Sequence, residues 1–89
     1  MQQIYRQMGE RIRHLRQERG FTQEAFADAS EIHRSHLGEI ERGEVDVSLT
    51  TLIKIGYGLQ MPISSLLRDI GVTRRQQWSR PEQGRQRPR

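Results

Sequence analysis

The side chains most able to recognise a ligand stand together in residues 34–43, where guanidinium, hydroxyl, imidazole and carboxylate groups follow one another closely. Arg34 can donate two parallel hydrogen bonds to O6 and N7 of guanine, a contact worth about 1–3 kcal/mol of discrimination. Ser35 can reach a base or a phosphate, and Glu39 can accept a hydrogen bond from N4 of cytosine. Each residue also has an ordinary alternative as a solvated surface side chain, so the elements that position them decide between the two.

Other kinds of chemistry find less support. His33 and His36 are three residues apart and could share one metal ion, but no third ligand stands at a suitable spacing. The chain contains no cysteine, so it offers neither a disulfide nor a thiolate ligand or nucleophile. No nucleophile, base and orienting acid form a catalytic set. We therefore predict no metal, no cofactor and no enzymatic activity.

Two short apolar patterns occur in close succession within residues 22–43. Phe26 and Ala27 belong to the first, Leu37 and Ile40 belong to the second, and a short joint separates them. Two helices this short and this close must pack as a tight bent pair, which is a helix-turn-helix over about residues 22–42. Its predicted parts are a Thr22 N-cap, a helix over residues 23–29, a turn over 30–32, and a helix from residue 33 to 41 or 42 that Gly43 stops.

A helical wheel at about 100° per residue divides the second of these helices into two sides. Leu37 and Ile40 define the side that faces the core. The outward and flanking positions are Arg34, Ser35, His36, Gly38 and Glu39. Gly38 costs helix stability on an exposed face, and close approach to DNA would explain it.

Residues 2–19 have the pattern of a first helix. Tyr5, Met8, Ile12 and Leu15 recur at spacings of three and four residues. Gly9 weakens this helix by roughly 1 kcal/mol relative to alanine, so we expect the ordered part to start near Gly9.

Two charged residues fall on apolar sides of their helices. Arg16 lies four residues after Ile12, and Glu41 falls near the inner side of the second motif helix. A buried charge needs a partner, and the two charges have opposite signs. We therefore predict a buried ion pair between Arg16 and Glu41.

The second half of the chain predicts two more helices. Ser48 can cap a helix over residues 49–59, in which Gly56 allows close packing and Gly58 loosens the end. A short fifth helix over residues 63–70 carries more apolar surface than one neighbour can hide, so we expect part of it to form a dimer face. Its apolar residues are Ile63, Leu66, Leu67 and Ile70.

Residues 71–89 consist largely of Arg, Gln, Pro and Gly, with Trp78 as the only large apolar side chain. Burial in such a segment cannot offset the entropy cost of ordering it, so we predict a flexible tail. No strand pattern occurs anywhere. The predicted fold is all-α: a compact five-helix DNA-binding domain over residues 1–70, followed by this basic tail.

The charge of the chain is unevenly distributed. The formal net charge is +4, yet residues 71–89 contain six arginines and one glutamate, so residues 1–70 sum to −1. A pI near 10.6 favours an acidic partner such as nucleic acid. Individual side chains, rather than a general positive charge, must therefore account for DNA binding by the nearly neutral domain.

No apolar run reaches bilayer length and no signal-peptide pattern opens the chain, so we expect a cytoplasmic protein without a membrane partner.

Residues 9–67 resemble the lambda-repressor and Cro-like helix-turn-helix proteins, often called the Xre type. The matching runs are GERIRHLRQERG, FTQEAFA, IERG and VSLTTLIKIGYGL. The run HRSHLGEIERGEVDVSL resembles more narrowly the small controller proteins of restriction-modification systems.

This resemblance implies roles for individual residues. Gln23 would contact a phosphate, and Arg34, Ser35 and Glu39 would meet base edges in the major groove. It also implies the buried pair of Arg16 with Glu41, and a homodimer formed through the fifth helix. The full set of DNA-contact candidates is Thr22, Gln23, Arg34, Ser35, His36, Gly38, Glu39, Arg42 and Gly43.

Three departures from the family pattern carry structural expectations. Glu31 stands at the usual turn glycine, so it would adopt the left-handed backbone conformation. His33 replaces the usual serine or threonine cap. Val45 and Asp46 replace residues that are often basic and asparagine, which weakens any phosphate contact by that loop.

The function that follows is a homodimeric, sequence-specific transcription regulator that reads a near-palindromic operator with half-sites about one helical turn apart. The arginines of the tail would add sequence-independent attraction to phosphates. A second hypothesis is an antitoxin or other protein-interaction module, in which residues 71–89 with Trp78 order on a protein partner.

Overall fold

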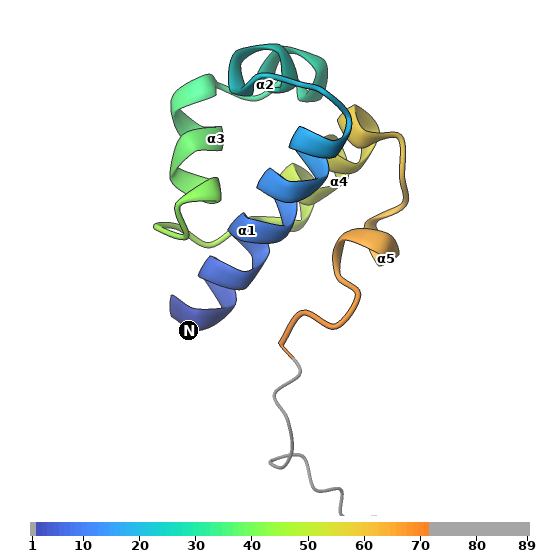
Figure 1. The fold of residues 1–89 in the computed structure, drawn as a ribbon. Coiled ribbons are helices and arrows are strands. Elements are labelled where there is room, and N and C mark those ends of the chain that lie inside the picture. The colour runs from blue at the N-terminus through green and yellow to red at the C-terminus, as the bar shows by residue number, and fades with distance from the viewer. Residues whose placement is uncertain (1, 72–89) are drawn as a thin grey trace, which may run out of the picture.

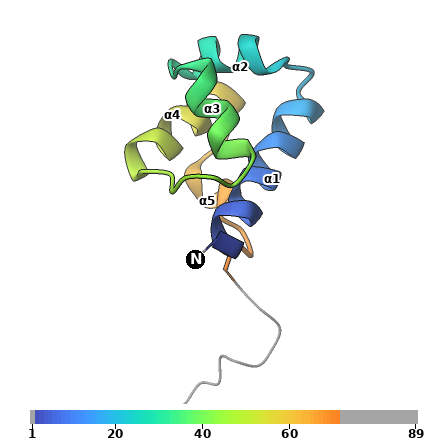
Figure 2. The same cartoon turned by 90° about the vertical axis from the view of Figure 1, so that its left-hand side faces the viewer.

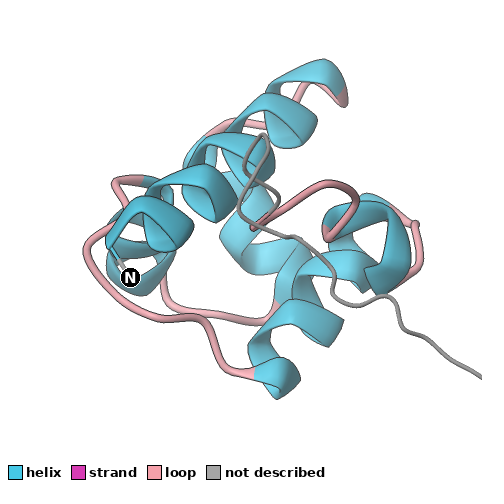
Figure 3. Cartoon of the chain, turned by 90° about the horizontal axis from the view of Figure 1, so that it is seen from below, coloured by secondary structure: helices cyan, strands magenta, loops and turns pink. Residues whose placement is uncertain are grey.

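The computed structural model describes residues 2–71, and all of their regular structure is helical. The elements, in order, are α1 (Gln2–Glu18), α2 (Gln23–Ser30), α3 (Arg34–Glu41), α4 (Leu49–Leu59) and α5 (Ile63–Leu66), as Figure 1 labels them. Figure 3 shows only helices and loops in this part of the chain. The predicted five-helix, all-α fold is confirmed. The predicted tail over residues 71–89, with its predicted protein partner, lies outside the described residues except for Gly71.

One apolar core joins all five helices, because each contributes buried apolar side chains. Phe26, Leu37 and Ile55 are among its fully buried members. Helix α1 packs against α3, and α2 packs against both α3 and α4. The short α2–α3 pair is therefore held from two sides.

Helix α1 is continuous from Gln2, so the expectation of a start near Gly9 was wrong. Gly9 is buried, and a Cβ atom at this position would lie 2.3 Å from the carbonyl oxygen of Ile40 and 2.7 Å from that of Glu41. The absence of a side chain lets α1 touch the backbone of α3. Packing at this crossing offsets the low helix propensity of glycine, which is a local quantity.

Caps define the ends of the motif helices much as predicted. The Thr22 hydroxyl accepts a hydrogen bond from the Ala25 amide at 3.1 Å, and Glu31 adopts the left-handed conformation with φ 59° and ψ 43°. The boundaries differ by one residue: α2 includes Ser30, and α3 begins at Arg34. His33 is the N-cap of α3 and makes no side-chain capping hydrogen bond.

Helix α4 has the predicted bounds, and Ser48 caps it by accepting from the Thr51 amide at 3.1 Å. The expectation that Gly58 loosens its end was wrong. A Cβ atom at Gly58 would lie 2.2 Å from Ser30 Oγ and 2.9 Å from Phe26 Cε1. Gly58 thus lets α4 pack closely against α2.

An arginine of α1 and the arginine that follows its end contact the ends of the last two helices. Arg19 donates from Nε to the Leu59 carbonyl at 2.8 Å. Arg11 donates to the carbonyls of Leu66 and Arg68. Side chains that reach free helix carbonyls in this way satisfy acceptors that the helix itself leaves open.

Helix α5 is shorter than predicted, because it ends at Leu66 and residues 67–71 continue as turns. The assignment of Leu66 to a dimer face was wrong, since its side chain is fully buried in the core. Ile63 and Ile70 are partly buried against that core. Leu67 is the one predicted face residue that is a large exposed apolar side chain, at 40% exposure.

Candidate nucleic-acid interface

Helix α3 projects from one side of the molecule. In Figure 2 it stands in front, with α2 above it and with α1 and α4 on either side. Leu37 and Ile40 are fully buried beneath it, while Arg34 and Ser35 are exposed. The predicted division of α3 into an apolar inner side and a polar outer side is therefore present.

Arg34 stands at the first turn of α3 and approaches α2. Its Nη1 atom lies 3.9 Å from Glu24 Oε1, and the two side chains are 64% and 79% exposed. Exposed pairs of this kind contribute little to stability. The guanidinium can therefore leave Glu24 for a ligand at small cost.

His36 and Glu39 are partly exposed and adjoin each other along α3. His36 Nδ1 lies 3.5 Å from Glu39 Oε1, across one turn of the helix. The His36 imidazole thus neighbours the carboxylate that was predicted to accept from a base.

Gly38 is buried, so the expectation that it opens onto solvent was wrong. A Cβ atom at Gly38 would lie 3.1 Å from Arg42 Nη1, because the long Arg42 side chain folds back along the helix. Glu44 holds it there with contacts of 2.8 Å to Nε and 3.2 Å to Nη2. This hydrogen-bonded pair raises the pKa of Arg42 and lowers the pKa of Glu44. Any ligand that reaches Gly38 must first displace Arg42.

The predicted ion pair between Arg16 and Glu41 is confirmed. Arg16 donates from Nε to Glu41 Oε2 at 2.7 Å and from Nη2 to Oε1 at 3.0 Å, and both side chains are buried. Its third nitrogen donates to the Phe21 carbonyl at 2.9 Å. This two-pronged geometry is the strong form of a charged pair, and it ties α1 to the last turn of α3.

Gln23 is a third member of this cluster that sequence reasoning missed. Its Nε2 donates to Glu41 Oε1 at 3.1 Å and connects the start of α2 to the end of α3. An amide nitrogen carries two hydrogens, so the second remains for a phosphate. No sequence pattern links residue 23 to residue 41, and only the fold brings them together.

The loop between α3 and α4 explains one departure from the family pattern. Val45 is partly buried and packs against the core, so it serves the fold rather than a phosphate. Asp46 is exposed, and its carboxylate would repel a phosphate.

No helix within residues 2–71 combines the length and apolar character that crossing a membrane requires.

Comparison with known proteins identifies the family. The helix-turn-helix model HTH_3 matches residues 12–65. Control protein C.MunI from Mycoplasma sp is 37% identical over 71 residues, which cover 79% of this chain and 96% of that protein. The HTH-type transcriptional regulator SutR from Escherichia coli K12 is 34% identical over 67 residues, which cover 75% of this chain but only 38% of SutR.

A solved structure agrees with these relatives. The restriction-modification controller protein C.AhdI from Aeromonas hydrophila superposes with a TM-score of 0.68 at 35% identity, over 70% of this chain and 94% of that one. The likeness agrees with the prediction that the chain is not an enzyme. The chain therefore belongs to the helix-turn-helix family, a family of DNA-binding transcriptional regulators, and α2, the turn at Glu31 and α3 are its motif.

Proposed function

We propose that this chain is a homodimeric regulator of transcription that inserts α3 into the major groove of a specific, near-palindromic operator. The observation that carries the proposal is the exposed polar side of α3, which stands clear of the core on a base locked by Arg16 and Glu41. A helix with its side chains is roughly 10–12 Å wide and the major groove is about 12 Å wide. The outer side of α3 therefore reaches base edges directly.

Arg34 and Ser35 are the side chains that we assign to base recognition, together with Glu39. A bidentate arginine–guanine contact is the strongest of these. Thr22 and Gln23 lie at the start of α2 and donate hydrogen bonds to DNA phosphates. The Thr22 hydroxyl accepts the capping hydrogen bond and keeps its own hydrogen for a phosphate oxygen. The backbone near Gly43 completes the phosphate contacts.

A homodimer places two copies of α3 in successive stretches of groove, about one helical turn apart. Exposed apolar side chains support such a dimer. Leu49, Ile53 and Tyr57 recur every four residues along α4 and are 65%, 45% and 77% exposed. We therefore extend the proposed dimer face from Leu67 to this side of α4, because exposed apolar surface is typical of interfaces.

Substitution of Arg34 tests the proposal. A duplex that the protein prefers is first recovered from a random-sequence library, and its affinity is then measured at fixed salt. Arg34→Ala is expected to lower that affinity by about 1–3 kcal/mol, or roughly 5-fold to 150-fold, for each subunit bound, and to relax the preference at one base pair in each half-site.

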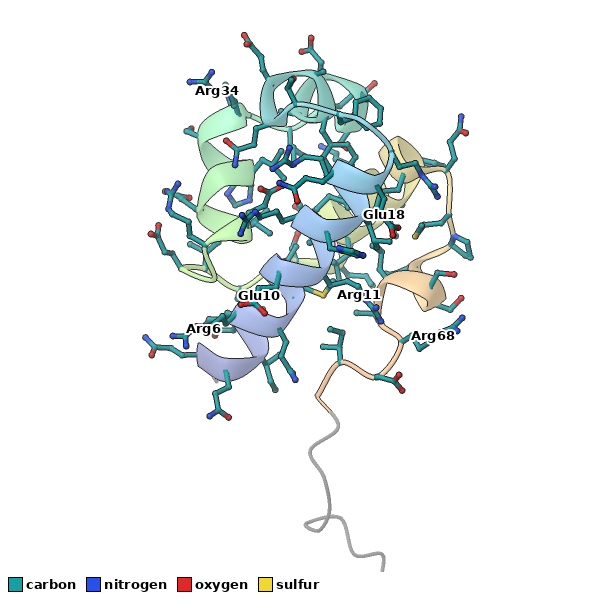
Figure 4. All side chains as sticks on the ribbon, viewed as in Figure 1. Arg6, Glu10, Arg11, Glu18, Arg34 and Arg68 are labelled. Carbon is teal, nitrogen blue, oxygen red and sulfur yellow. The ribbon has the colours of Figure 1, made fainter. Side chains whose placement is uncertain are left out.

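Arg68→Ala is the matched control, because this exposed arginine lies on the other side of α1 (Figure 4). Equal affinities for the Arg34→Ala and Arg68→Ala proteins would refute the recognition role of Arg34. Recovery of no preferred duplex by the unmodified protein would refute the proposed function itself.

A further inference from the structure

A cleft of about 560 Å³ opens beside α3, where α1 meets the start of α2 and the end of α3. Arg6 and Arg13 of α1 line it, together with Gln23, Arg16 and Arg42. Four arginines thus converge on one cleft in a domain whose net charge is close to zero.

Two glycines bring the arginines of α1 to the edge of α3. Gly9 touches the last turn of α3, and Arg6 and Arg13 stand three residues before it and four residues after it. These spacings place all three residues on the same side of α1. At Gly43 a Cβ atom would lie 2.8 Å from Arg6 Cα, so the loop after α3 rests directly on the backbone of Arg6.

Two of the four arginines already have acidic partners. Arg16 is bound by the buried Glu41, and Arg42 is bound by Glu44. Their charges are therefore largely compensated within the protein.

Arg6 and Arg13 differ from these two. Both are exposed, and neither takes part in any ion pair of the described residues 2–71. Glu10 is the one remaining carboxylate on the lining, so the cleft has a net charge of +1. An anion that enters it would find two free guanidinium groups.

We propose that Arg6 and Arg13 bind phosphates of the DNA strand that borders the groove containing α3. A helix that fills the major groove has a sugar–phosphate strand on each side, and α1 flanks α3 on one side (Figure 2). Figure 4 shows Arg6 and Glu10 on the side of α1 toward α3, whereas Arg11 and Arg68 lie on the opposite side. This assignment rests on the proposed function, because it extends the same interface.

Gln23 gives the cleft a neutral donor beside the two cations. Its second amide hydrogen is not used by Glu41, and the residue lines the same cleft. Glu10 acts in the opposite sense, since a carboxylate between two phosphate-binding arginines repels the strand. Glu10 therefore lowers the affinity of the cleft for phosphate.

Salt dependence tests the proposal, because each phosphate contact contributes about 0.9 to the slope of the logarithm of the binding constant against the logarithm of the salt concentration. The unmodified protein, Arg6→Gln, Arg13→Gln and the double variant are titrated with a random-sequence duplex and with the duplex recovered by selection. Each single substitution is expected to reduce the slope by about 0.9 per subunit bound on both duplexes, and to leave their affinity ratio unchanged.

Three further variants separate a phosphate contact from general loss of charge. Arg68→Gln removes the same charge from the far side of α1 and is expected to keep the full slope. Arg13→Lys retains the cation and is expected to keep it as well. Glu10→Gln is expected to tighten binding to both duplexes, and circular dichroism verifies that each variant is folded.

A slope for the double variant equal to that of Arg68→Gln would overturn the proposal. A changed affinity ratio with an unchanged slope would also overturn it, because the arginines would then read bases. Failure of the unmodified protein to prefer any sequence would refute the proposed function alone, since the random-sequence duplex still decides whether the arginines bind phosphate.

Discussion

Glu41 has three polar contacts at the end of α3, and they come from two other parts of the chain. Arg16 Nε and Nη2 arrive from α1, and the Gln23 amide arrives from α2. A carboxylate with a side-chain exposure of 3% depends on these donors, because burial deprives it of water.

Removal of one member of this cluster is expected to be costly. Arg16→Met should lower the free energy of unfolding by about 3–5 kcal/mol, since Glu41 is left buried with one neutral donor. Urea unfolding followed by circular dichroism measures the loss. The double variant Arg16→Met/Glu41→Leu is expected to lose less than Arg16→Met alone, because no stranded charge remains. A loss below about 1 kcal/mol for Arg16→Met would contradict the burial of the pair.

The ion pair could be predicted from sequence because two charges of opposite sign interrupt apolar stripes. Gln23 and Gly9 could not be interpreted in the same way. The contact of Gln23 with Glu41 and the contact of Gly9 with the Ile40 carbonyl both join residues far apart in sequence. Local propensity contains no information about such partners.

At the level of elements, the ends of α2 and α4 were close to prediction because their caps are local. Thr22 and Ser48 each bond a backbone amide three residues on. Helix α5 was overestimated for a different reason. Its apolar residues were expected to continue one helix to about residue 70, whereas Leu66 enters the core and the chain then turns, with Asp69 at a φ of 63°.

Glu31 connects α2 to α3 in a conformation that disfavours any residue with a Cβ atom. Its φ of 59° is of the kind that glycine adopts freely. Glu31→Gly is expected to raise the free energy of unfolding by up to about 1 kcal/mol, the relief of left-handed strain being partly offset by the greater freedom of glycine in the unfolded chain.

Thermal and urea unfolding measure this effect, and Ala25→Gly is the control. Ala25 is also exposed but lies inside α2, where glycine in place of alanine is expected to destabilise by roughly 1 kcal/mol. Similar losses for the two substitutions would show that Glu31 is not strained.

At the scale of the whole molecule, the two proposed functional surfaces lie on different elements. The polar side of α3 and the arginines of α1 serve DNA in the proposed complex, while Leu49, Ile53 and Tyr57 of α4 are apolar and uncharged. Two-fold pairing through α4 therefore leaves the proposed DNA contacts free.

A charge within the apolar side of α4 tests the dimer. Tyr57→Asp is expected to weaken self-association at least tenfold, or by about 1.4 kcal/mol, because the partner would have to bury a carboxylate. Sedimentation velocity over a range of concentrations measures it. Gln17→Glu adds the same charge at an exposed site on α1 and should have no effect. A monomeric unmodified protein would rule out the homodimer.

The buried contacts that fix α3 to the core have a consequence for how this protein could come to bind new operators. Leu37, Ile40 and Glu41 hold α3 from within, so its folding does not depend on the identity of Arg34, Ser35 or Glu39. These three proposed base-recognition residues can therefore be substituted without disturbing the fold. A library randomised there should yield mostly folded proteins, and selection among them should recover variants that read different operators on an unchanged frame.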